Sequence, residues 1–127
     1  MNLNAELEAA LLSLTQSGTS ARATLQFKGS EVFFDGHFPE RPVLPAVVQV
    51  AVAMFVADRV AGRALQLVEV TRATFLNPTG PGVPLTLDVS LEPAEEGRLR
   101  VKALMREGEK PVAELSLRVV PQDAATQ

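Results

Sequence analysis

The stretch from Ala46 to Val60 is apolar on nearly every side and contains no proline or glycine, and Gly62 follows shortly after it. This pattern predicts a helix, and a helix that is apolar all round is normally enclosed by other elements. Valine is a mediocre helix former, so burial has to stabilise a helix that contains so many valines. The rest of the chain is therefore expected to wrap around this segment.

Strands are predicted on both sides of the helix, because the hydrophobic pattern changes there to a period of two. In the C-terminal half, apolar and polar side chains alternate along three successive segments, which are joined by short links containing glycine or proline. Such a series is typical of an antiparallel meander with one face toward the core and one toward water. The expected strands are 21–28, 65–75, 85–91, 99–105 and 113–119.

The two ends of the chain complete the predicted domain. Leucines recur at helical spacing ahead of Gly18, which predicts an N-terminal helix over 1–18. Residues 121–127 are expected to form a flexible tail. The 127 residues fit one domain, 1–127. For this domain we predict an α+β fold, in which one antiparallel sheet wraps around a long central helix at about residues 46–60.

Composition excludes several classes of function. The chain has no cysteine, which rules out disulfides and thiolate chemistry, and its single histidine leaves no ligand set for a transition metal. The net charge is −3 and the lysines and arginines are scattered, which argues against nucleic-acid binding. The segment from Met1 to Thr15 lacks the cations of a secretory signal, and the longest apolar stretch is too short to span a membrane. We expect a cytoplasmic protein without cofactor or metal.

The only histidine lies in a stiff segment directly ahead of the predicted central helix. Residues 36–45 read Gly-His-Phe-Pro-Glu-Arg-Pro-Val-Leu-Pro. Each proline fixes its own φ and disfavours helix at the preceding residue, so the segment is expected to be an extended loop. His37 can exchange a proton near neutral pH. The start of the following helix offers unpaired N–H groups and a partial positive charge.

This motif, with a buried helix and a meander after it, resembles the active-site segment of the hot-dog fold 3-hydroxyacyl-ACP dehydratases. The motif covers about ten residues, and the order of elements matches over most of the chain. Residues 44–49, Leu-Pro-Ala-Val-Val-Gln, are most similar to the small dehydratases of aryl-polyene-type biosynthesis. The resemblance implies an acyl-ACP substrate and a dimer whose sheets join edge to edge, with acyl tunnels along the interface. It also implies a site shared between subunits, with a histidine base from one and an acid from the central helix of the other.

Carried over to this chain, the resemblance makes His37 the base that removes the α-proton of a 3-hydroxyacyl thioester. The backbone N–H of Ala46 becomes the donor to the thioester carbonyl, at a position where the family has glycine. The acid that would protonate the leaving hydroxyl falls on Ala51, and alanine transfers no proton. The remaining candidates for substrate contacts are Phe38, Pro45 and Gln49.

No neighbouring polar residue replaces this acid on simple helix geometry. Gln49 can orient a water or a hydroxyl group but cannot act as an acid, and it points about 200° away from position 51 around the helix. Asp58 shares a helix face with Ala51 but lies roughly 10 Å further along the axis. Asp35 is a candidate to orient His37.

Three functions therefore stay open. The first is a 3-hydroxyacyl-ACP dehydratase of fatty-acid or polyene-type biosynthesis in which water near Gln49, or an acid from elsewhere, supplies the proton. The second is a catalytically incomplete subunit that pairs with a hot-dog paralogue providing the acid. The third is an acyl-thioester binding protein or a thioesterase, since hot-dog folds host several thioester reactions. The expected assembly is accordingly a homodimer or a heterodimer with a paralogue.

Overall fold

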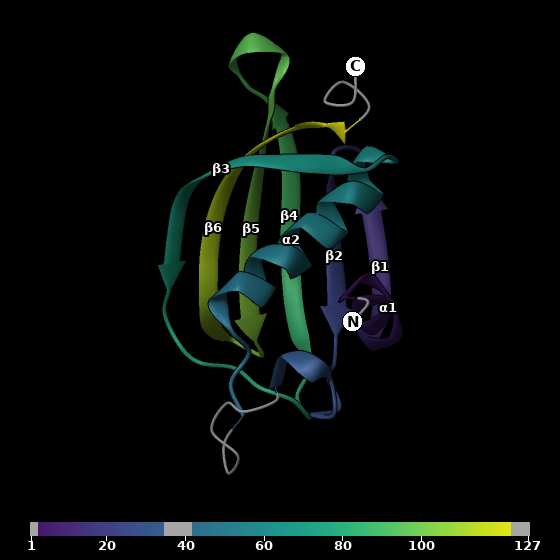
Figure 1. Cartoon of the computed structure of the whole chain (residues 1–127), viewed down its shortest axis with the longest axis vertical. Helices are drawn as coiled ribbons and strands as arrows, with labels where there is room; N and C mark the ends of the chain where they lie inside the picture. Colours follow the sequence, from purple (N-terminus) through teal and green to yellow (C-terminus); the bar gives the residue numbers. More distant parts are fainter. Residues whose placement is uncertain (1–2, 35–41, 123–127) are drawn as a thin grey trace.

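The computed structural model describes residues 3–34 and 42–122. These residues form one antiparallel sheet of six strands and two α-helices, and the longer helix crosses one face of the sheet (Figure 1). The strands lie in the order β1-β2-β4-β5-β6-β3. The elements are α1 (Leu3–Ala10), β1 (Leu11–Ser17), β2 (Ser20–Leu25), α2 (Ala46–Ala61), β3 (Leu65–Phe75), β4 (Leu85–Pro93), β5 (Leu99–Glu107) and β6 (Lys110–Pro121), with 3-10 turns at Val32–Phe34 and Glu95–Gly97.

The central helix α2 is confirmed, and in this single chain it is enclosed on one side only. Pro45 precedes it, and Gly62 ends it in a left-handed conformation with φ 71°. The side toward the sheet is fully buried at Val52 and Val56. The opposite side stays partly open to solvent, most of all at Val47, which is 76% exposed. No helix in the described ranges combines the length and apolarity that a membrane crossing needs.

The apolar residues of the predicted alternation lie on the inner face of the sheet, and the polar residues lie on its outer face. In β4, Leu87 and Val89 are buried beneath α2, whereas Asp88 between them points to the outer face. The ladder to β5 keeps this order, with Leu87 opposite Met105 and Val89 opposite Ala103, and both partners are buried as well. β4, β5 and β6 follow one another as the predicted meander. The core therefore lies between these strands and α2.

The N-terminal helix is shorter than predicted. α1 ends at Ala10, and the next residues form β1, which pairs with β2 in an antiparallel ladder. The helix expected over 1–18 is therefore wrong beyond Ala10. A turn at Gly18, with φ 59°, lets the chain fold back and bond to β2, and this pairing outweighs the helical spacing of the leucines. Leu11 and Leu14 still pack against the core, but they do so from a strand.

The tail predicted over 121–127 is also contradicted at its start. Pro121 is still part of β6 and lies opposite Leu65, and Gln122 donates its N–H to the carbonyl of Ala64 at 3.0 Å. These contacts hold the chain against the start of β3, so the tail predicted over 121–127 is wrong at its first two positions. Residues 123–127 lie outside the described part.

β3 is an edge strand that contains two bulges. Its only neighbour among the described strands is β6, and Val68 and Thr71 are extra residues that the β6 ladder skips. Because of these bulges, Glu69 and Arg72 both point to the outer face of the sheet, opposite outward residues of β6. The inner face of the strand carries the apolar positions Leu67, Val70, Ala73 and Phe75.

A candidate active site at the start of the central helix

The segment that contains His37 is held firmly at its beginning. Phe33 and Phe34 pack edge-on against Phe27, with ring centroids 5.4 Å and 6.1 Å from the Phe27 centroid, and all three rings are buried. This cluster fixes the chain just ahead of residue 35. His37 and Phe38, the predicted base and a predicted substrate contact, lie outside the described residues. Their roles therefore stay predictions.

The end of the same segment is held by a turn between β3 and β4. The N–H of Leu44 donates to the carbonyl of Thr79 at 2.7 Å, and the Leu44 carbonyl accepts from Nε2 of Gln49 at 3.1 Å. A Cβ at Gly80 would lie 2.4 Å from the carbonyl oxygen of Pro42, so this close approach requires glycine. The chain thus enters α2 along a path that is fixed from two sides.

The turn is itself tied to the hairpin between β5 and β6. The hydroxyl of the buried Thr79 donates to Glu107 at 2.9 Å, and Glu107 pairs with Lys110 at 3.3 Å. Nearby, the side-chain amide of Asn77 donates to the carbonyl of Pro111 at 2.8 Å. No local pattern in the sequence connects Thr79 or Gly80 with the site.

The first turn of α2 leaves two N–H groups without an acceptor among the described residues. Val48 and Gln49 both donate to the carbonyl of Pro45 at 3.0 Å, and no side chain caps the helix. Ala46 and Val47 are exposed, and their N–H groups point out of the helix start. The helix dipole makes this position favourable for an oxygen with negative charge. The predicted donor, the N–H of Ala46, is therefore available.

Gln49 belongs to the first turn of α2, and the residue is buried, with only 5% of its surface exposed. Its Nε2 supports Leu44, while its Oε1 is buried without a hydrogen-bond partner among the described residues. A buried acceptor left unpaired costs ~1–3 kcal/mol, so this oxygen favours any donor that reaches it. This oxygen, close to the helix start, is thus the atom through which Gln49 could serve its predicted role in substrate binding.

The ionisable groups along α2 do not include a replacement acid. Ala51 is partly exposed on the side away from the sheet. Asp58, two turns further on, accepts the N–H of Leu65 at 3.0 Å and so closes the connection into β3. Burial raises the pKa of Asp58, and the hydrogen bond from Leu65 opposes that shift. Within 3–34 and 42–122, no cluster of three acidic or histidine side chains is placed to hold a metal ion.

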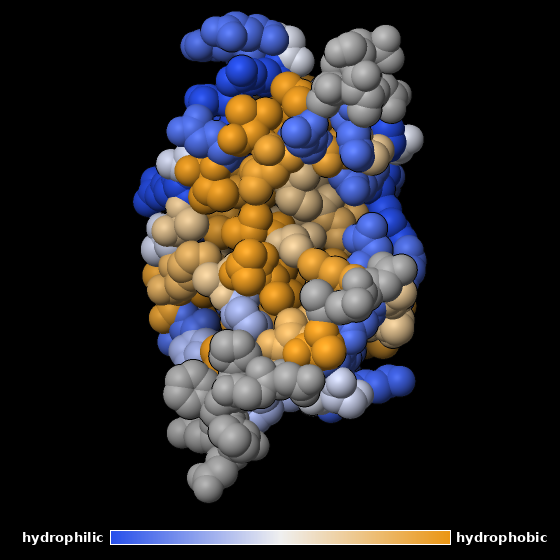
Figure 2. Space-filling model, viewed as in Figure 1, coloured by the Kyte–Doolittle hydropathy of each residue, from blue (hydrophilic) through white to orange (hydrophobic). Residues whose placement is uncertain are grey.

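An uncovered apolar patch adjoins this site. Figure 2 shows hydrophobic side chains gathered over α2 and β3, on the face where the helix lies. Monomeric proteins rarely expose a contiguous apolar surface of this kind, so it indicates a contact with another chain or an acyl group. The exposed members of the apolar patch, which are 37–76% exposed, are Val47, Leu67, Val68, Val70, Phe75 and Leu76.

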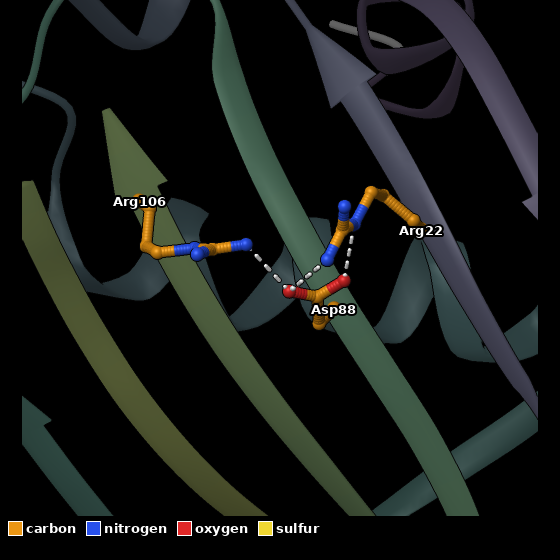
Figure 3. A network of polar contacts seen from close by, with 3 residues as sticks. All are labelled: Arg22, Asp88 and Arg106. Atoms are coloured by element: carbon orange, nitrogen blue, oxygen red, sulfur yellow. Dashed lines mark hydrogen bonds and ion pairs between the residues drawn. The ribbon is translucent and has the colours of Figure 1, made fainter. Parts of the chain in front are cut away.

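A depression of about 1070 Å³ lies elsewhere, on the outer face of the sheet. Polar side chains such as Ser90 and Lys102 line it. Asp88 forms an ion pair there with Arg22 at 2.7 Å and with Arg106 at 2.9 Å (Figure 3). Walls of hydroxyl and charged groups do not suit an acyl chain, so the helix start remains the better candidate.

Comparisons with known proteins include matches to dehydratases. A family model described as ApeI dehydratase matches residues 13–115. The 3-hydroxyacyl-[acyl-carrier-protein] dehydratase FabZ of Polaromonas sp. is 30% identical over 112 residues, which cover 80% of this chain and 77% of that protein. FabZ of Gluconobacter oxydans is 30% identical over 107 residues, covering 77% of this chain and 63% of the relative. The dehydratase heterocomplex ApeI:P from Xenorhabdus doucetiae matches with a TM-score of 0.72 at 20% identity, over 87% of this chain and 96% of that chain. This last likeness confirms the hot-dog fold.

Proposed function

Because the chain belongs to the ApeI-like dehydratase family, we propose that it removes water from 3-hydroxyacyl thioesters carried by acyl carrier protein. The observation that carries this proposal is the fixed junction ahead of α2. Leu44 is held through both of its backbone groups, and the helix start then presents the N–H of Ala46, which has no acceptor in the described part of the chain. A thioester carbonyl bound at this N–H would lie at a positive helix end, next to an open apolar face.

In the proposed reaction a proton leaves the α-carbon and the hydroxyl leaves the β-carbon, so that a carbon–carbon double bond and water form. His37 is the proposed base for the first proton. As that proton leaves, negative charge grows on the thioester oxygen, and the N–H of Ala46 stabilises it. His37 stands nine residues before Ala46, in a segment whose two flanks are both anchored.

The departing hydroxyl needs a second proton, which Ala51 cannot supply. We infer that this proton comes either from a water bonded to Oε1 of Gln49 or from an acid of a second chain. General acid catalysis contributes ~10²–10⁴-fold, so the chain without a partner's acid is expected to be a slow dehydratase. The Gln49 oxygen near the helix start has no hydrogen-bond partner within 3–34 and 42–122, which supports the first source.

A catalytically incomplete subunit is the second candidate, and the alanine at position 51 favours it together with the apolar patch. In this alternative, a hot-dog paralogue covers the patch and its own helix provides the acid. The ApeI:P structure is described as a heterocomplex, which is the kind of assembly that this alternative requires.

Turnover by the purified chain tests the proposal. A 3-hydroxyacyl-ACP is incubated with the chain alone, and mass spectrometry follows the loss of water. We expect slow dehydration that disappears in His37→Ala. If dehydration is equally fast in His37→Ala, the proposed base is wrong. If the thioester is instead hydrolysed to free acid, the protein is a thioesterase.

A matched pair of variants at position 51 separates the two candidates. Ala51→Glu introduces the acid, whereas Ala51→Gln adds a side chain of the same size that cannot donate a proton. A rate gain of about 100-fold in the Glu variant alone is expected if the scaffold is competent and only the acid is absent. Equal rates in the two variants would argue that the proton already comes from elsewhere.

A further inference from the structure

We propose that Glu107, in the hairpin between β5 and β6, is a positioning residue for the proposed reaction, because it fixes Thr79 and, through Thr79, the segment that leads into α2. The inference deepens the proposed function and rests on it, since it adds a residue that acts on the helix start without contacting the reacting atoms. The link from Glu107 to Leu44 can also be measured without turnover, so the two proposals can fail separately.

Thr79 binds two distant parts of the chain through two different polar groups. Its hydroxyl donates to Oε1 of Glu107 at 2.9 Å, and its carbonyl accepts the N–H of Leu44 at 2.7 Å. Thr79 is only 5% exposed and Leu44 only 1%, so little water reaches these groups to replace their partners. A displacement of Thr79 therefore displaces Leu44 as well.

Leu44 in turn determines how the chain enters α2. Its carbonyl accepts from Nε2 of Gln49 at 3.1 Å, and the carbonyl of the next residue, Pro45, accepts N–H groups of the first helical turn. One residue separates Leu44 from Ala46, whose N–H is the proposed donor to the thioester carbonyl. Because the ring of Pro45 fixes its φ, which is −63°, a shift of Leu44 moves or tilts this N–H.

Glu107 is suited to this role because it is itself held at the end of the sheet. It is the last residue of β5 and pairs with Lys110, the first residue of β6. Its Oε2 lies 3.3 Å from Nζ of Lys110, which leaves Oε1 for the hydroxyl of Thr79. Gly108, with φ 61°, lies in the tight turn between the two strands. This hairpin and the start of α2 lie at the same end of the sheet (Figure 1).

Other contacts hold the beginning of the turn between β3 and β4 but not Thr79. The N–H groups of Leu76 and Asn77 donate to the carbonyl of Val112 at 2.8 Å and 3.3 Å. The residue after them is a proline, which has no N–H to donate. In the part of the chain that the structure describes, the bond to Glu107 is therefore the hydrogen bond that ties Thr79 to the hairpin. Without it a buried hydroxyl would be left unpaired, and the turn would relax.

Loss of this bond should affect the reaction more than substrate binding. The N–H of Ala46 acts on negative charge that grows as the α-proton leaves, so its orientation matters most in the transition state. The apolar patch, where an acyl group would bind, includes neither Thr79 nor Glu107. A misplacement of about 1 Å near reacting groups can lower a rate ~100-fold, so a smaller shift is expected to lower kcat by about tenfold and to change KM by less than about twofold.

Substitutions at both ends of the hydrogen bond test its role. Glu107→Ala removes the acceptor and Thr79→Val removes the donor, so each should lower kcat by about tenfold. Glu107→Gln keeps an oxygen acceptor and Thr79→Ser keeps the hydroxyl, so both should retain kcat within about threefold. The double variant Glu107→Ala, Thr79→Val should be no slower than either single variant, because both changes remove the same bond.

Lys110→Met is the matched control in the hairpin. It removes the ion pair of Glu107 and leaves the bond from Thr79 in place. It should retain its kcat, because partly exposed ion pairs contribute little to stability.

Amide hydrogen exchange measures the link to the helix start without turnover. Glu107→Ala should speed the exchange of the Leu44 amide relative to the amides of β4. Leu117→Ala, which empties a fully buried site in β6, should lower stability without this selective change at Leu44. It should likewise retain its kcat, which separates positioning from a general loss of stability.

Four results would overturn the proposal. They are unchanged exchange of the Leu44 amide in Glu107→Ala, an equal loss of kcat in Glu107→Gln and Glu107→Ala, a change in KM without one in kcat, and losses that add in the double variant. A wild-type chain that does not dehydrate overturns the proposed function instead. The exchange of the Leu44 amide then still supports or overturns the link from Glu107 to the helix start.

Discussion

Replacing Gly80 with alanine should loosen the junction that leads into α2. A Cβ at position 80 would lie 2.4 Å from the carbonyl oxygen of Pro42, whereas real Cβ atoms essentially never approach other atoms within 3.0 Å. The turn and the segment ahead of the helix must therefore separate by at least ~0.6 Å, since interiors are close-packed. The contact nearest to this movement is the 2.7 Å hydrogen bond from Leu44 to Thr79, which should lengthen.

The size of the effect follows from this geometry. Forcing a methyl group into a filled site typically costs ~1–3 kcal/mol of the free energy of unfolding. A misplacement of about 1 Å near reacting groups can lower a rate ~100-fold, so a movement of ~0.6 Å is expected to lower dehydration by about tenfold. Both losses should appear together, because the same segment contributes to folding and leads into the helix start.

Urea unfolding and amide hydrogen exchange measure the two consequences separately. Gly80→Ala should lower the free energy of unfolding and reduce the protection of the Leu44 amide. Gly82→Ala is the control in the same turn: its φ of 85° makes alanine strained by ~1–2 kcal/mol, but no atom lies within 4 Å of the added Cβ. It should lose stability without exposing the Leu44 amide. Unchanged stability and Leu44 protection in Gly80→Ala would refute the role of this turn.

Four further substitutions, at three positions, have defined outcomes. Asp58→Ala removes the acceptor of the Leu65 N–H and should cost ~1–2 kcal/mol in urea unfolding. Asp58→Asn keeps an acceptor and removes a carboxylate whose pKa is raised by burial, so this variant should be at least as stable as wild type at pH 7. Its advantage in stability should shrink as the pH falls. It should vanish below pH 3.8, the ordinary pKa of the group in the unfolded chain, because Asp58 is then protonated in both states. Asp88→Ala breaks two partly exposed ion pairs and should change stability by less than ~1 kcal/mol, with the difference lost at high salt. Leu117→Ala empties a fully buried site and should cost ~2–5 kcal/mol, measured in the same way.

Most of the sheet could be predicted because its inner face is buried and its outer face is wet. Apolar and polar residues therefore alternate along β4, β5 and β6. The bounds expected for β3 agree with those observed. The N-terminal helix could not be delimited in this way. The leucines at positions 11 and 14 fit a helical period, yet they also reach the core from a bulged strand. Only the pairing with β2 distinguishes the two conformations.

The candidate site was predictable in its linear part and not in its tertiary part. A helix start after Pro45 follows from local rules and is what the structure contains, whereas the role of the Ala46 N–H stays a prediction. The support of Leu44 by Thr79 joins two loops that are far apart in the sequence, and no local pattern indicates it. The bulges of β3 were equally invisible, because they arise from the register with β6.

Ala51 lies on the side of α2 that the sheet does not cover. A substitution at this position can therefore change the activity without changing the stability of the single chain. Core positions such as Val52 are constrained by packing, whereas a change at position 51 leaves the interior of the single chain intact. A carboxyl group can therefore be gained or lost there by a substitution that the fold tolerates. After a gene duplication, one copy could keep the acid and the other could lose it, while both still folded and still recognised each other. Pairs of active and inactive subunits are then an accessible outcome for chains of this architecture.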